Sequence, residues 1–179
     1  MSVWRRWPQR ERRPAGRDYG TAPGYVLPDE PFTGAGRPIL DGFLDRYRAS
    51  FLNRCSGLTA GQLAERSVPP SNLSLIGIAR HLTDVELSYF RRRWGRQEIA
   101  SYYVSEDRPD ADFEDASPAT AERDLQRLAA EQQAARQAVA GMPLDTIFVN
   151  PRWGEMSLCW ALIHMIGEYA GHTGQESPG

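Results

Sequence analysis

In this chain of 179 residues lysine is missing, cysteine is scarce and long apolar runs are absent. The last two features each exclude a class of protein. Lysine is absent, so arginine supplies all 21 basic side chains. The two cysteines, Cys55 and Cys159, are too few for the disulfide framework of a small secreted protein, and we expect both to be buried, reduced thiols. No apolar run approaches the roughly 20 residues that a membrane helix needs. These absences favour a cytoplasmic protein without a membrane partner.

Residues 1–36 are rich in arginine, proline and glycine and show no hydrophobic periodicity. This composition predicts a flexible N-terminal arm at 1–36 ahead of one folded domain at 37–179. Within residues 1–17 six arginines stand against one glutamate, a net charge of +5 in a chain whose total is −2. A basic tail can bind nucleic-acid phosphates, but the absence of lysine indicates a general bias toward arginine. We therefore expect no nucleic-acid partner.

Four later segments space their apolar residues as helices do, and they predict an all-α fold with a four-helix bundle. We expect these helices at about residues 39–56, 71–94, 117–139 and 155–172. Ser71 or Asn72 is the expected N-cap of the second helix, because each offers a side-chain oxygen to the first turn. The acidic segment 96–116 predicts a long crossover between the second and third helices, and residues 146–149 favour a short extended piece before the fourth.

The three histidines, His81, His164 and His172, all fall in the second and fourth expected helices. On the fourth helix His164, Glu168 and His172 follow one another at intervals of four residues. An α-helix completes a turn in about 3.6 residues, so such neighbours share one face and can act on a common ligand.

Glu168 and His172 also continue the spacing of the apolar seam that reaches Met165, which directs them toward the other helices. A carboxylate on a buried seam costs several kcal/mol unless it is paired or coordinated. A divalent metal removes this cost, and His81 from a facing helix completes three protein ligands beside an open position, as in catalytic zinc sites. The alternative is an ordinary surface hydrogen bond between Glu168 and His172.

Three stretches of the sequence together resemble the DinB-like superfamily. They are LDGFLDRYR at 40–48, VPPSNLSL at 68–75 with RHL at 80–82, and WALIHMIGEYA at 160–170. The resemblance covers about residues 37–175 and is closest to a branch of unassigned function related to mycothiol-dependent maleylpyruvate isomerase. It implies an up-down-down-up bundle in which His81, Glu168 and His172 hold one metal ion.

The function that this resemblance implies is that of a thiol-dependent S-transferase or isomerase. The metal would activate the thiolate of a small molecule such as mycothiol for attack on an electrophile. Two imidazoles and a carboxylate favour Zn²⁺, with Ni²⁺ and Fe²⁺ as alternatives. We predict His164 as the catalytic residue that orients a ligand or shuttles a proton, unless it only bonds a neighbour.

Charged residues near His81 complete the predicted site. Asp84 and Glu86 are candidate hydrogen-bond acceptors beside the metal, with solvated surface acids as the alternative. Arg80 and the arginines at 91–93 are candidates to meet an anionic substrate, although cations at the end of a helix more often interact with its dipole.

Two positions depart from the pattern of that branch and support a rival interpretation. Gly171 replaces an arginine and Gln175 replaces a histidine, which puts activity in question more than fold. The alternative is a non-catalytic metal-binding or stress-associated bundle protein with a vestigial site. Both interpretations leave open whether the chain forms a homodimer.

Overall fold

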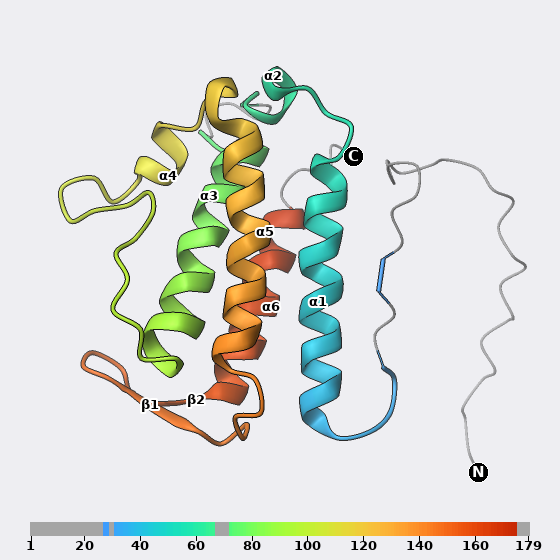
Figure 1. Ribbon diagram of the computed structural model, residues 1–179, viewed down its shortest axis with the longest axis vertical. Helices are drawn as coiled ribbons and strands as arrows, with labels where there is room; N and C mark the ends of the chain where they lie inside the picture. The colour runs from blue at the N-terminus through green and yellow to red at the C-terminus, as the bar shows by residue number, and fades with distance from the viewer. Residues whose placement is uncertain (1–26, 29–30, 67–71, 175–179) are drawn as a thin grey trace, which may run out of the picture.

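The structure of the protein is a computed structural model that describes residues 27–28, 31–66 and 72–174 (Figure 1). The predicted arm at 1–36 lies mostly outside the described residues. So do Ser71, one of the two expected N-caps, and Gln175, one of the two departures from the family pattern. The boundary between arm and domain therefore stays a prediction.

Helices make up most of the described chain, as the sequence predicts, and the strands form a small antiparallel hairpin. The elements in chain order are α1 (Gly36–Cys55), α2 (Ala60–Leu63), α3 (Leu75–Glu86), η1 (Leu87–Trp94), α4 (Ala111–Glu114), η2 (Pro118–Thr120), α5 (Ala121–Ala138), β1 (Ile147–Asn150), β2 (Gly154–Ser157) and α6 (Leu158–Gly174). Within the described ranges, no helix is both long enough and apolar enough to cross a membrane.

Four long helical segments lie side by side: α1, α3 with its continuation η1, α5 and α6 (Figure 1). Helices α1 and α6 run in one direction along the body of the protein, and α3 and α5 run in the other. The most extensive contacts join α3 to α5 and α1 to α6. The β1–β2 hairpin lies at the end of the body where α6 begins, and α2 and α4 lie toward the opposite end.

The second long helix begins later than the sequence predicts. Ser74, rather than Asn72, is the N-cap of α3, because its side chain accepts a hydrogen bond from the backbone N–H of Gly77 (3.1 Å). Beyond Glu86 the backbone widens into the π-helix η1, which carries three consecutive arginines and ends at Trp94. The predicted end of this helix is therefore close to the observed one, and its predicted start is wrong.

The fourth long helix begins at Leu158, not near Glu155 as predicted. Glu155 belongs to β2 and pairs with Val149 of β1. Asn150 stabilises the turn between the strands, since its side-chain oxygen accepts hydrogen bonds from backbone N–H groups two and three residues later (2.8 and 3.1 Å). Gly154 supplies the left-handed conformation (φ 78°) that the turn requires. This turn favours a hairpin where the sequence pattern predicts a first helical turn.

The buried seam of α6 passes through Leu158 and Met165, as the spacing predicts, but it continues to Tyr169 and not to Glu168. Tyr169 is fully buried, whereas the side chains of Glu168 and His172 are 26% and 18% exposed. The two predicted metal ligands therefore lie on the flank of the seam. Their partial contact with solvent lowers the cost of burial that the sequence argument assigned to them.

The acidic link at 96–116 is attached to the body of the protein and contains the short helix α4. Asp84 of α3 accepts hydrogen bonds from three consecutive backbone N–H groups of the link, at 102–104 (2.7, 3.0 and 3.2 Å). The buried guanidinium of Arg80 donates to two backbone carbonyls at the start of α4 (both 2.8 Å). Neither Asp84 nor Arg80 serves the role predicted from the sequence, because both hold the link against α3.

A buried polar cluster joins the four long helices. The guanidinium of Arg48 in α1 donates two hydrogen bonds to the carboxylate of Glu86 in α3 (2.7 and 2.6 Å), and these side chains are 3% and 0% exposed. The hydroxyl of Tyr169 in α6 donates to the same carboxylate (3.0 Å), and the amide of Gln132 in α5 donates to that hydroxyl (2.9 Å). Burial raises the pKa of Tyr169 well above its usual value, so its phenol stays protonated and can donate.

Replacing Glu86 by alanine removes the buried counter-charge of the Arg48 guanidinium and leaves it the partly exposed carboxylate of Asp45 (3.1 Å). We expect the free energy of unfolding to fall by about 3–5 kcal/mol, the range typical of breaking a buried ion pair from one side. Urea denaturation followed by circular dichroism measures this change.

The control for that variant is Arg108→Ala, which removes an exposed ion pair with Asp115 (2.7 Å) and should leave the urea midpoint unchanged. The double variant with Arg48→Met and Glu86→Leu removes both charges and should be less destabilised than Glu86→Ala. A small loss for Glu86→Ala, equal to that of the control, would contradict the central role of the buried pair.

Candidate metal centre

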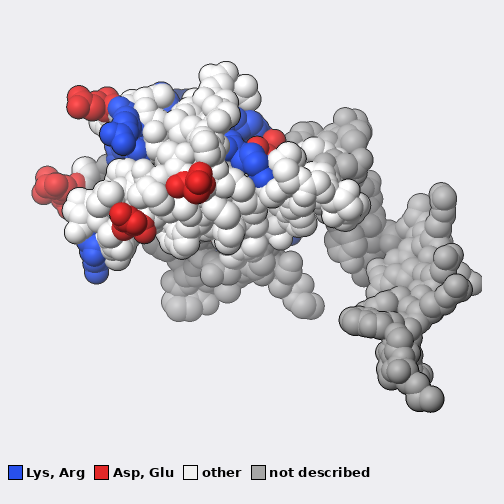
Figure 2. Space-filling model, turned by 90° about the horizontal axis from the view of Figure 1, so that it is seen from below, with Lys and Arg blue, Asp and Glu red and all other residues white. Residues whose placement is uncertain are grey.

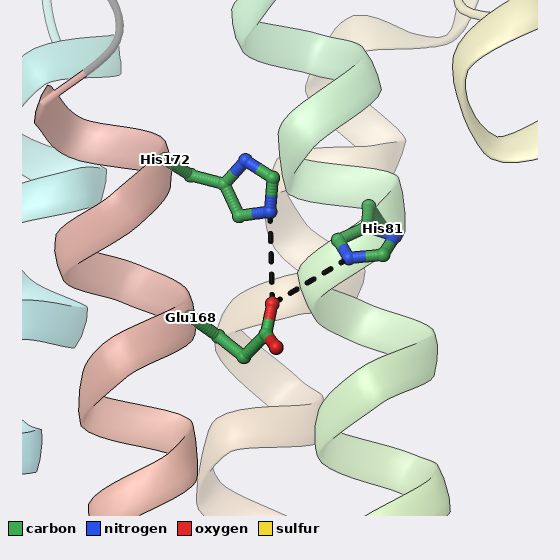
Figure 3. Close-up of side chains that lie close together, drawn as sticks. All are labelled: His81, Glu168 and His172. Carbon is green, nitrogen blue, oxygen red and sulfur yellow. Dashed lines mark ion pairs between the residues drawn. The ribbon is translucent and has the colours of Figure 1, made fainter.

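His81 lies on the side of α3 that faces α6 (Figure 3). Two residues of helix α4 hold its imidazole in place. Its Nδ1 lies 2.9 Å from Oδ2 of Asp112, and its ring stacks on Phe113 with centroids 5.1 Å apart. The close approach of α4 depends on Gly77, because a Cβ there would lie 3.2 Å from the Phe113 ring. With Nδ1 donating to Asp112, Nε2 is the nitrogen left to bind another group.

The Nε2 atom of His81 lies 3.9 Å from Oε2 of Glu168, and that of His172 lies 3.7 Å from the same oxygen. One potential ligand atom from each residue lies within 4.8 Å of the other two. Figure 3 shows all three side chains pointing into the space between α3 and α6. The structure thus brings together the three residues that the sequence predicted as metal ligands, while their role as ligands stays a prediction.

The geometry of this cluster fits a divalent cation. Metal–ligand bonds of about 2.0–2.2 Å at tetrahedral angles place neighbouring ligand atoms about 3.3 Å apart. The two separations from Glu168, 3.7 and 3.9 Å, are slightly longer than this and too long for direct hydrogen bonds. All three atoms lie within 4.8 Å of one another, so side-chain rotations would have to bring them closer to surround an ion. The side chains are also partly exposed, which leaves a fourth coordination position accessible from solvent.

In the metal-free protein the carboxylates and imidazoles of the cluster compensate one another's charge. The neighbouring imidazoles of His172 and His81 hold the pKa of Glu168 well below its usual range. Burial acts to lower the pKa of His81, but its interactions with Asp112 and Glu168 outweigh burial and raise that pKa to about 9. At neutral pH a proton on His81 therefore compensates the carboxylates, and a metal ion has to displace it.

His164 contacts the cluster from one turn earlier on α6. Its Nε2 lies 3.2 Å from Oε1 of Glu168, the carboxylate oxygen that does not face His81 and His172 in the ion pairs above. Its ring stacks on Trp160 with centroids 4.8 Å apart and planes at 8°. His164 is thus placed to orient Glu168, and its catalytic role stays a prediction.

Asp112 is the residue of the site that the sequence analysis missed. It lies 31 positions from His81 in the chain, so no helical periodicity connects the two. Glu86, which was predicted to support the site, pairs with Arg48 instead. His172 differs from His81, because its buried Nδ1 has no hydrogen-bond partner in the described part of the chain. No described residue therefore orients His172 through Nδ1 as Asp112 orients His81.

The three arginines near the end of η1 make contacts within the protein. Arg91 donates to the carboxylate of Glu131 (2.8 Å), and Arg92 donates to a backbone carbonyl of the acidic link. The guanidinium of Arg93 lies 3.9 Å from the centre of the Tyr89 ring. These contacts do not support the predicted role of the arginines in binding an anionic substrate.

The fold and the cluster define a helical protein with a candidate metal centre between two of its long helices. The family model described as Mycothiol-S-transferase matches residues 39–177, and the chain belongs to that family. This family is part of the DinB-like superfamily, so the resemblance found in the sequence is confirmed. No curated protein and no solved structure matches the chain.

Replacing Asp112 by asparagine removes the charge that orients His81 and nearly preserves the side-chain volume. We expect the affinity for Zn²⁺ to fall about 10- to 100-fold, the usual effect of losing a residue that orients a metal-bound imidazole. Competition with a chromophoric chelator measures the affinity. Asp115→Asn, which changes an exposed carboxylate of the same segment, is the matched control, and identical affinities for both variants would refute the orienting role.

Metal binding at neutral pH should release about one proton. His81 has a raised pKa of about 9 in the metal-free protein, yet it must be neutral to bind a metal. Glu168 is already ionised and contributes no proton, so affinity should rise with pH and level off above about pH 9. Titration calorimetry in buffers of different ionisation enthalpy counts the released protons, and an affinity independent of pH between 7 and 9 would contradict the assignment.

Proposed function

We propose that the protein is a metal-dependent transferase that joins the sulfur of a low-molecular-weight thiol, such as mycothiol, to an electrophilic second substrate. An isomerase that uses the same thiol is the related alternative. Membership of the family supports the choice of thiol, because the family description names mycothiol in S-transfer. The side chains of the cluster between α3 and α6 are partly exposed, which agrees with small molecules as substrates.

The observation that carries this proposal is the convergence of His81, Glu168 and His172 to within 4.8 Å. Two imidazoles and one carboxylate form the ligand set of many catalytic zinc sites, in which a fourth position stays open. A Zn²⁺ ion there, or Ni²⁺ or Fe²⁺ in its place, would supply the positive charge that favours the thiolate form of a thiol at neutral pH.

The protein's own residues would orient the ligand atoms and admit the substrates. Asp112 holds His81 so that Nε2 faces Glu168, and His164 holds the other oxygen of that carboxylate. During transfer the thiol gives up its proton to solvent, its sulfur forms a bond to a carbon of the electrophile, and the displaced group leaves with the bonding electrons.

We also propose that residues 37–179 form the functional domain and that the protein acts in the cytoplasm. The family match at 39–177 falls within that domain. Cys55 is buried, Cys159 is partly buried, and both are in the thiol form, which agrees with a reducing compartment.

Replacing His172 by alanine should remove both the bound metal and the activity. The assay mixes Zn²⁺-loaded protein with mycothiol and monochlorobimane and follows the fluorescent conjugate, beside elemental analysis of each sample. We expect conjugation to fall more than about 100-fold, beyond the effect of losing a residue that only orients a ligand. Glu122→Ala, an exposed position in the first turn of α5, is the control that should keep metal and activity.

One result would support the rival function and overturn the transferase. It is a native protein that holds the metal but gives no conjugation above background and no thiol binding by calorimetry. The protein would then be a metal-binding bundle with a vestigial site.

A further inference from the structure

An aromatic pocket adjoins the candidate metal centre. It has a volume of about 590 Å³, and its lining residues come from η1, the β1–β2 hairpin and the first turns of α6. The lining includes Tyr89, Trp153, Met156, Trp160 and His164. This volume suits a small organic molecule, and the lining is that of a site that recognises rings by contact with their faces.

Two indole rings of the pocket are unusually open to solvent. Trp153 is 59% exposed and Trp160 is 43% exposed. Large apolar side chains gathered around a concave surface are typical of binding sites, because a ligand removes their apolar area from water. Figure 2 views the molecule from the hairpin end and shows a surface on which side chains other than Lys, Arg, Asp and Glu predominate.

Contacts within the protein hold three rings of the pocket in place, those of Tyr89, Trp160 and His164. Trp160 and His164 stack nearly parallel, and the Tyr89 ring lies 4.8 Å from His164 and 6.1 Å from Trp160, centroid to centroid. The guanidinium of Arg93 lies over the Tyr89 ring. A binding surface that is ordered before the ligand arrives loses little conformational entropy on binding.

His164 connects the pocket to the candidate metal centre. Its ring lines the pocket, while its Nε2 lies 3.2 Å from Oε1 of Glu168. One helical turn, a rise of about 6 Å, separates these two residues on α6. A ligand that contacts His164 in the pocket therefore lies next to a side chain that itself contacts the carboxylate of Glu168.

We propose that this pocket binds a flat, electron-poor aromatic molecule without net charge, and that this molecule is the electrophile of the transfer. The binding of this molecule is inferred from the pocket alone, whereas its role as the electrophile rests on the proposed function. The faces of indole and phenol rings are electron-rich and prefer electron-poor partners. Electron withdrawal also makes a ring carbon reactive toward a thiolate, so one property serves both recognition and reaction. The charges beside the pocket are mixed, because Glu155 lines it while the guanidinium groups of Arg93 and Arg152 lie 3.9 and 5.6 Å from the centres of the Tyr89 and Trp153 rings. This balance favours a ligand without net charge.

The binding test uses the full-length, metal-free protein and equilibrium dialysis, a readout that does not depend on tryptophan fluorescence. The probe is meta-dinitrobenzene, which has no halide to lose and therefore cannot be conjugated by displacement. Trp153→Ala and Trp160→Ala should each weaken its binding about three- to tenfold, the usual worth of one aromatic contact. Ile163→Ala, an exposed apolar position of α6 outside the pocket, is the matched control and should leave binding unchanged.

Circular dichroism confirms that each variant is folded, and Trp153→Phe should recover most of the binding that Trp153→Ala loses. Para-dimethoxybenzene, an electron-rich ring of similar shape, should bind more weakly than the dinitro compound. The proposal is overturned if the two rings bind equally, or if removing Trp153 and Trp160 changes nothing.

A kinetic test separates this proposal from the proposed function. With chlorodinitrobenzene the thiol sulfur bonds the ring carbon and chloride leaves with the bonding electrons. In Trp153→Ala the KM for this substrate should rise about three- to tenfold, while the KM for iodoacetamide, a small aliphatic electrophile, should not change. Conjugation with an unchanged KM overturns the claim that the molecule bound in the pocket is the electrophile, and it leaves the transferase intact. Ring binding without any conjugation overturns the transferase and leaves the pocket as a binding site.

Discussion

The buried ion pair between Arg48 and Glu86 is the constraint on which the arrangement of the helices depends. Two charges taken out of water are stable only when every polar atom around them is satisfied, and here the hydroxyl of Tyr169 and the amide of Gln132 complete the network. Each of the four side chains comes from a different long helix. The cluster therefore specifies how the helices face one another, which apolar contacts alone specify less strictly.

The same cluster also sets the orientation of the candidate metal centre. Tyr169 follows Glu168 directly in α6, so the rotation that places the phenol against Glu86 also directs Glu168 and His172 toward α3. Because neighbouring helical residues point about 100° apart, the carboxylate comes to lie on the flank of the core and not within it. That position combines partial exposure, which leaves the cluster accessible from solvent, with enough burial to strengthen the interactions among the charges.

Irregular segments supply the remaining parts of the site. The acidic link brings Asp112 and Phe113 to His81, and the β1–β2 hairpin brings Trp153 and Met156 to the pocket beside His164. Regular helices hold the three potential ligands at defined distances, while the irregular segments contact His81 and line the neighbouring pocket. This division explains why the helices could be predicted from periodicity, whereas most of the surroundings of the site could not.

The sequence by itself determined what depends on neighbours along one helix. Apolar spacing located the long helices, and intervals of four residues placed His164, Glu168 and His172 on one face, because helical geometry is local. Only the tertiary structure decided that Asp112 orients His81, that Tyr169 rather than Glu168 continues the seam, and that a hairpin occupies the expected start of the last helix. These features depend on hydrogen bonds and burial between segments distant in the chain. Such contacts stabilise the protein only after folding has brought those segments together, so a local sequence pattern does not reveal them.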